Sequence, residues 1–189
     1  MKVVAFGHKK RVGKDTCAKF LTSLIRTKTN IKHVKTVSFA GPLKETAYSL
    51  YSWAGLREAD FYELEANEHL REAVLPAIGK TPRQIWIELG NKCREIYERT
   101  WLDALFKNPQ NQCDVMIVKD LRFLNEALEL VNEYQATLAK VNRPGMPIGT
   151  DKAEIDLNDF NGWNFELEND SNMENLFKQV EKLFESLKL

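Results

Sequence analysis

Short apolar runs alternate with longer stretches of helical spacing along most of the chain. The runs at residues 3–6 and 115–118 are continuous, which is typical of strands that are buried on both faces of a parallel sheet. The pattern predicts further strands at residues 33–39, 136–142 and 163–167.

Apolar residues three and four positions apart predict helices between these strands. Thr81-Pro82 is a clear helix start, with Thr as the N-cap and Pro in the first turn, and residues 59–72 are rich in helix formers. Strands that alternate with helices predict an α/β fold with a mostly parallel five-stranded sheet flanked by helices. A length of 189 residues fits a single domain. The other expected helices lie at residues 15–28, 43–53, 101–106, 125–133 and 173–187.

The turn after the first strand has the residues of a phosphate-binding loop. Gly7 and Gly13 bound a basic segment, and Lys14 stands where the next helix begins. Glycines bring backbone N–H groups close to an anion, and a helix start adds unpaired N–H groups at the positive end of its dipole. The pattern predicts a polyphosphate site with Lys14 on the β- and γ-phosphates. The alternative is an ordinary strand–turn–helix corner with a solvated basic turn.

The spacing of this turn departs from the usual phosphate loop, which has four residues between its first glycine and Gly-Lys. Gly7 and Gly13 enclose five residues, and His8 stands where the first glycine normally falls. Asp15 follows Lys14, and the hydroxyl comes one place later, at Thr16. Thr16 can donate to a phosphate oxygen or bind Mg²⁺, whereas Asp15 either joins the metal shell or only stabilises the helix start.

Polar residues also follow other predicted strands, and ligands of parallel sheets bind at the carboxyl ends of strands. Asp120 fits a Mg²⁺-water acceptor or a strand-end turn residue. Arg122 could clamp a phosphate bidentately or pair with Glu126, four residues on. Arg143 could reach the phosphate crevice or form a structural pair. Arg83 lies in the first turn of a helix, where its positive charge is unfavourable next to the positive end of the helix dipole. A substrate phosphate bound there would compensate for this charge; the alternative is an arginine that is only solvated.

Composition narrows the class of protein. Lys and Arg together number 27, as do Asp and Glu, so a general polyanion binder is not indicated. Cys17, Cys93 and Cys113 are widely and irregularly spaced, which fits neither a disulfide framework nor a zinc site. No apolar stretch approaches the roughly 20 residues that span a bilayer. These features predict a cytoplasmic protein with no membrane partner.

Several short motifs, taken in order, resemble the bacteriophage deoxynucleoside monophosphate kinase family, a group of P-loop kinases. They are Gly13-Lys14-Asp15-Thr16, Phe39-Ala40-Gly41-Pro42-Leu43-Lys44, Thr81-Pro82-Arg83-Gln84-Ile85 with Leu89-Gly90, Asp120-Leu121-Arg122-Phe123 with Asn125-Glu126, Val141 with Arg143-Pro144, and Asn169-Asp170. The resemblance implies a P-loop kinase fold, Mg-ATP as donor, a deoxynucleoside 5′-monophosphate as acceptor and a place in deoxynucleotide metabolism, in the host cytoplasm if the chain is viral. It also implies a helical monophosphate-binding insertion at about residues 42–99 and a variable loop at about 145–161.

The residue patterns and the resemblance together predict four sets of site residues. The catalytic residues are Lys14, Asp120, Arg122 and Arg143. The ATP-binding residues are Gly7, Lys10, Arg11, Val12, Gly13, Lys14, Asp15 and Thr16. The substrate-binding residues are Lys44, Arg83, Gln84, Trp86, Arg122 and Glu126, although a tryptophan such as Trp86 is more often part of a core. The metal-binding residues are Asp15, Thr16 and Asp120.

The chain departs from the family pattern at the extra loop residue and at two other places. Gly41 replaces an aspartate that is usual after Phe-Ala. Asp151-Lys152-Ala153-Glu154 stands where family members have a His-x-Ser-Glu element, so no role is carried over to it.

Other functions fit parts of the same pattern. One is a P-loop kinase for another phosphorylated acceptor, such as phosphomevalonate or dephospho-coenzyme A. Another is a non-catalytic nucleotide sensor or nucleic-acid-binding module that uses residues 9–11, although net neutrality disfavours nucleic acid as the main ligand. Amphipathic helices and exposed tryptophans leave room for a homodimer.

Overall fold

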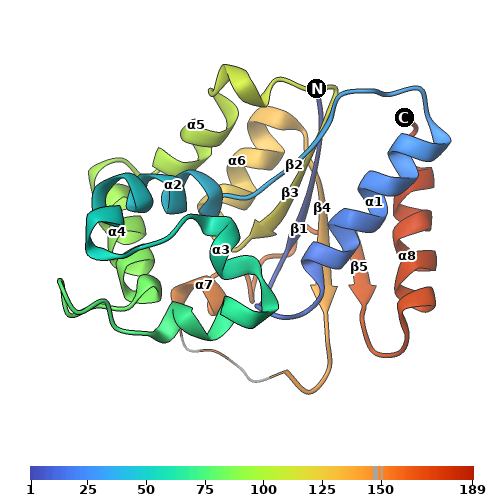
Figure 1. The fold of residues 1–189 in the computed structure, drawn as a ribbon. Coiled ribbons are helices and arrows are strands. Elements are labelled where there is room, and N and C mark those ends of the chain that lie inside the picture. Colours follow the sequence, from blue (N-terminus) through green and yellow to red (C-terminus); the bar gives the residue numbers. More distant parts are fainter. Residues whose placement is uncertain (147–148, 150) are drawn as a thin grey trace. The chain divides into compact units, whose positions relative to one another are not determined.

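The fold is built on five parallel strands, in the order β2-β3-β1-β4-β5. We analysed a computed structural model that describes residues 1–146, 149 and 151–189. β1 (Lys2–Gly7) lies at the centre between β3 (Val115–Leu121) and β4 (Thr137–Asn142), and β2 (Val34–Val37) and β5 (Phe165–Glu168) form the edges (Figure 1). The predicted five-stranded α/β sheet is therefore confirmed, and it is compatible with a P-loop-like fold.

Two long helices cover one face of the sheet. α1 (Lys14–Lys28) and α8 (Met173–Ser186) share a core with β1, in which Leu21, Val180 and Leu183 are completely buried. This explains the helical spacing of apolar residues in both segments. α6 (Leu124–Tyr134) lies on the other side of the strands (Figure 1) and buries Ala127 and Leu130.

Contacts within the chain divide it into two compact units, and the second unit is helical. The first unit comprises Met1–Ser38 and Pro109–Leu189, and contains the sheet; the second is Phe39–Asn108. The second unit overlaps the helical insertion expected at residues 42–99. It comprises α2 (Ala40–Tyr51), η1 (Ser52–Ala54), α3 (Ala59–Glu63), η2 (Glu65–Glu72), α4 (Pro82–Ile96) and α5 (Thr100–Phe106).

The second unit has a small core of its own, made by Ala47, Leu56, Tyr62 and Ile85. α4 begins at the predicted cap: Thr81 accepts a hydrogen bond from the backbone N–H of Gln84, and the Gln84 side chain accepts one from the Thr81 N–H. Both donors would otherwise be unpaired at a helix start, so this capping box fixes where α4 begins.

Two segments differ from the sequence-based expectation. The helix-rich stretch at 59–72 is broken, because Leu64 has an extended backbone between α3 and the 3₁₀ helix η2. The region at 145–161, expected to be an irregular loop, contains the short helix α7 (Lys152–Ile155), which buries Glu154. Residues 147, 148 and 150 of that expected loop lie outside the described residues.

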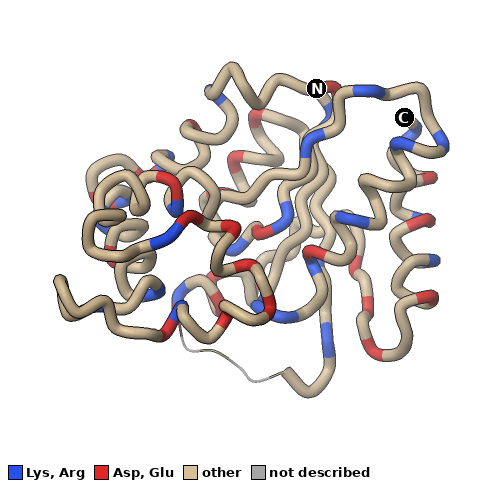
Figure 2. The backbone as a smooth tube through the Cα atoms, viewed as in Figure 1, with Lys and Arg blue, Asp and Glu red and all other residues tan. Residues whose placement is uncertain are grey.

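Acidic and basic residues are present in both units, and both signs occur along α8 (Figure 2). This distribution agrees with the equal numbers of the two charge types. Within the described part of the chain, no helix has the length and apolar character needed to cross a membrane.

Candidate phosphate-binding site

The backbone between β1 and α1 makes a tight loop that includes left-handed residues. Gly13 has φ of 106°, His8 of 94° and Arg11 of 57°. Gly7 belongs to β1, where it pairs with Leu121 of β3. Counted from His8 rather than Gly7, four residues precede Gly13. Gly7 ends the strand, and His8, which stands where the first glycine of a phosphate loop normally falls, has a positive φ.

Neighbouring elements hold this loop at both ends. The His8 N–H donates to the carbonyl oxygen of Leu121 at 3.3 Å, and the side-chain amide of Asn169 donates to the carbonyl oxygen of Val12 at 2.9 Å. A Cβ at Gly13 would lie 2.7 Å from Nδ2 of Asn169, and one at Gly7 would lie 2.6 Å from the ring of Trp163. A Cβ at either position would therefore force a neighbouring side chain to shift, and at Gly13 it would also be strained by the positive φ.

Lys14 turns its side chain back into the loop. The residue is only 5% exposed, and its ammonium group donates to the carbonyl oxygens of His8, at 3.2 Å, and Lys9. The pKa of Lys14 is lowered from 10.5 to about 8, chiefly because burial disfavours the charged form and secondly because Arg122 is positive. Negative charges on Asp120, Glu154 and Asp15 oppose that lowering. The ammonium group therefore lies where an additional anion would stabilise its charge.

The start of α1 adds backbone donors to the loop. Gly13 is the N-cap and offers no side-chain cap, and the first intrahelical bond runs from the Cys17 N–H to the Gly13 carbonyl at 3.0 Å. The N–H groups of the first turn therefore have no capping side chain at Gly13. Lys14, Asp15 and Thr16 occupy this first turn, at the positive end of the helix dipole.

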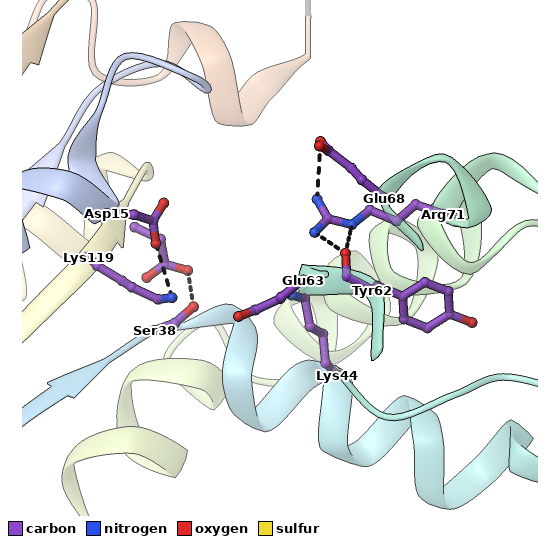
Figure 3. Close-up of polar contacts among 9 residues, drawn as sticks. Asp15, Ser38, Lys44, Tyr62, Glu63, Glu68, Arg71 and Lys119 are labelled. Atoms are coloured by element: carbon purple, nitrogen blue, oxygen red, sulfur yellow. Dashed lines mark hydrogen bonds and ion pairs between the residues drawn. The ribbon is translucent and has the colours of Figure 1, made fainter. Parts of the chain in front are cut away.

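Two carboxylates flank this helix start in the first unit. Asp120, near the end of β3, accepts a hydrogen bond from the Ser38 hydroxyl at 2.6 Å. Asp15 is exposed on α1 and pairs with Lys119 at 3.0 Å (Figure 3). Asp120 lies beside the loop because β3 is the direct neighbour of β1, and the negative charge of Asp120 acts on Lys14.

Arg122 follows β3 and pairs with a residue that the sequence did not single out for a role. Its Nη1 contacts Oε1 of Glu154, which is on α7. Glu126 accepts hydrogen bonds from the backbone N–H groups of Arg122, at 3.4 Å, and Phe123, at 3.3 Å, and so helps to cap α6. The suggested pairing of the Arg122 guanidinium with Glu126 is thus replaced by a pair with Glu154.

The remaining loop and strand-end residues are partly or wholly exposed, with one exception. Lys10 and Thr16 are partly exposed, and Arg11 and Arg143 are exposed, the latter just beyond the end of β4. Val12 is buried and belongs to the main core.

Four of the residues expected to bind the substrate lie in the second unit and have local partners there. The Lys44 ammonium lies 3.2 Å from Oε1 of Glu63, and Figure 3 draws both residues. The ammonium also lies 5.3 Å from the Trp86 ring centroid. Trp86 packs on the small core, 5.3 Å from the Tyr62 ring. The exposed Arg83 pairs with Glu72. Gln84 belongs to the capping box described above.

Sequence reasoning missed four residues that shape the loop region: Ser38, Lys119, Glu154 and Asn169. Asn169 was part of the motif pattern but had no assigned role, and its contact with Val12 spans most of the chain. Contacts of this length leave no spacing signal, so only the fold identifies them.

Comparison of the chain with models of known protein families finds no match, and comparison with curated proteins finds none either.

Proposed function

We propose that this chain is a deoxynucleoside monophosphate kinase that transfers the γ-phosphate of Mg-ATP to a deoxynucleoside 5′-monophosphate. The observation that carries the proposal is the buried Lys14 ammonium group, held by the carbonyls of His8 and Lys9 in a loop with left-handed residues that leads into α1. The resemblance to the phage kinase family supplies the substrates. The central position of β1 in a parallel sheet supports the choice of this loop as the site.

The donor phosphates would lie in the loop between β1 and α1. Backbone N–H groups from Gly13 to Thr16 would bind phosphate oxygens, and Lys14 would follow the transferred group as a mobile charge. Gly7, Lys10, Arg11 and Val12 complete the expected ATP-binding set. On binding, Lys14 would exchange the carbonyls of His8 and Lys9 for phosphate oxygens.

Mg²⁺ would be bound by oxygen donors near Lys14. Among the described residues there is no group of three or more His, Cys, Asp or Glu side chains that could hold a metal ion. Mg²⁺ is commonly bound by one or two carboxylates together with phosphates and water, and Asp15, Asp120 and the Thr16 hydroxyl supply such a set. Bound there, the ion would neutralise charge on the phosphates.

The acceptor would be held mainly by arginines. Arg122 and Arg143 directly follow β3 and β4, at the carboxyl ends of the strands, where the loop also lies. A guanidinium can clamp a phosphate bidentately. Arg83, Lys44, Gln84, Trp86 and Glu126 complete the expected substrate set. The reaction needs no strong base, because the attacking phosphate is already anionic.

A coupled assay of ADP release, run with each of the four common deoxynucleoside monophosphates, tests the proposal. We expect turnover with at least one of them, and a loss of about 10²–10³-fold in Lys14→Met, as for other lost electrostatic contacts. Lys28→Met is the matched control, because Lys28 ends the same helix and pairs with Glu181. No turnover with any monophosphate at micromolar enzyme would refute the proposal, and phosphomevalonate and dephospho-coenzyme A should be tested as rival acceptors.

A further inference from the structure

A buried carboxylate lies directly against the loop. The Glu154 side chain is only 3% exposed. Its Oε2 accepts a hydrogen bond from the backbone N–H of Lys10 at 3.0 Å, and its Oε1 contacts Nη1 of Arg122. A carboxylate is costly to bury unless donors satisfy its charge, and these two donors, one neutral and one positive, do so.

The two donors are of the kind that bind phosphate in proteins, a loop N–H group and a guanidinium. The carboxylate resembles a phosphoryl group in charge and in offering more than one acceptor oxygen. We propose that Glu154 is an internal anion, and that a phosphoryl group of the nucleotide displaces it from the Lys10 N–H and from Arg122. This proposal rests on the function proposed above, and it adds a defined subsite and a built-in competitor to that function.

Charge in the loop region supports displacement over joint occupancy. The negative charges of Glu154, Asp120 and Asp15 already act on the ammonium group of Lys14. A phosphate placed beside a retained Glu154 carboxylate would add repulsion between like charges. Glu154 also packs closely against Gly149: a Cβ at residue 149 would lie 2.7 Å from Cγ of Glu154, so the glycine leaves room for the Glu154 side chain.

Titration calorimetry with inorganic pyrophosphate tests the proposal. Glu154→Gln keeps the shape of the side chain and removes the charge, so we expect pyrophosphate to bind roughly tenfold more tightly than to the unaltered chain, given the strength of charge-assisted hydrogen bonds. The control Glu181→Gln removes the same charge at the other end of α1, where Glu181 pairs with Lys28, and should leave the affinity unchanged. Equal or weaker binding by Glu154→Gln would overturn the proposal and make Glu154 a residue that only positions Arg122.

A second variant covers the case in which Glu154→Gln does not fold. Glu154→Asp keeps the charge but withdraws the carboxylate by one methylene, so it should bind pyrophosphate more tightly by a smaller factor; no gain would also overturn the proposal. Pyrophosphate binding requires neither acceptor nor turnover. If pyrophosphate affinity falls in the order Glu154→Gln, Glu154→Asp, unaltered chain but no kinase activity is found, displacement is supported and the proposed function is refuted. If kinase activity is found but Glu154→Gln binds pyrophosphate no more tightly, the proposed function is supported and displacement is refuted.

Discussion

The lowered pKa of Lys14 predicts how phosphate binding depends on pH. Only the charged ammonium group attracts a phosphate, and its pKa of about 8 means that its charge is lost between pH 7 and pH 9. One pH unit above the pKa, about a tenth of the molecules retain the charge, so the affinity for ATP at pH 9 should be about tenfold lower than at pH 7. Bound phosphate favours the charged form, so the complex takes up a proton in this range.

Fluorescence or calorimetric titration with ATP from pH 7 to 9.5 measures this effect. The logarithm of Kd should be flat near pH 7 and bend upward near pH 8. Lys14→Arg provides the control, because a guanidinium stays charged throughout and its curve should show no bend. If the unaltered chain shows no bend below pH 9, or if Lys14→Arg shows the same bend, Lys14 does not bind the phosphate in the way we describe.

Three further predictions concern stability and the shape of the loop. Lys14 has a lower pKa in the folded chain than in the unfolded chain, so the unfolded chain binds more protons between about pH 8 and 10.5. The free energy of unfolding therefore rises with pH through that window, by up to roughly 3 kcal/mol from this site. In urea unfolding, Lys14→Met should be more stable than the unaltered chain at pH 7 by a margin that shrinks by pH 10, and a constant difference would contradict this. Gly13→Ala places a side chain at φ of 106° and should lose about 1–2 kcal/mol of stability, whereas Gly41→Ala, in α2 with open space around it, should be neutral or stabilising by about 0.5–1 kcal/mol in the same urea experiment. Asn169→Ala removes the hydrogen bond to the Val12 carbonyl. Because a neutral hydrogen bond contributes about 1 kcal/mol, the variant should bind ATP roughly three- to tenfold more weakly, with an unchanged pH profile. Binding of ATP with full affinity would show that the loop does not need this hydrogen bond.

The sheet could be predicted from sequence because its signals are local. The runs at 3–6 and 115–118 became β1 and β3, and Thr81-Pro82 became the capped start of α4. In the last helix, apolar residues lie three and four positions apart, and Leu176, Val180 and Leu183 are buried. Phe177 and Phe184 belong to the same pattern and are partly buried against the same core. In the strands and in the last helix, the apolar residues whose spacing predicts the element are also the ones that pack into the core.

The detail of the candidate site could not be predicted, because it depends on contacts distant in sequence. The left-handed backbone of His8 could not be inferred from sequence, because only a small share of non-glycine residues adopts a positive φ. The partner of Arg122 was sought four residues away at Glu126, but the guanidinium pairs with Glu154, which is 32 residues away. Short helices such as α7 also carry too few residues for a clear periodic signal.

The central claim is that the loop between β1 and α1 binds the donor phosphates, and an NMR titration tests it most directly. With uniformly ¹⁵N-labelled protein and Mg-ATP, the largest saturable changes in backbone amide signals should fall on Gly13, Lys14, Asp15 and Thr16, and Lys14→Met should abolish them. Saturable changes centred elsewhere in the chain, or none at millimolar Mg-ATP, would contradict the account.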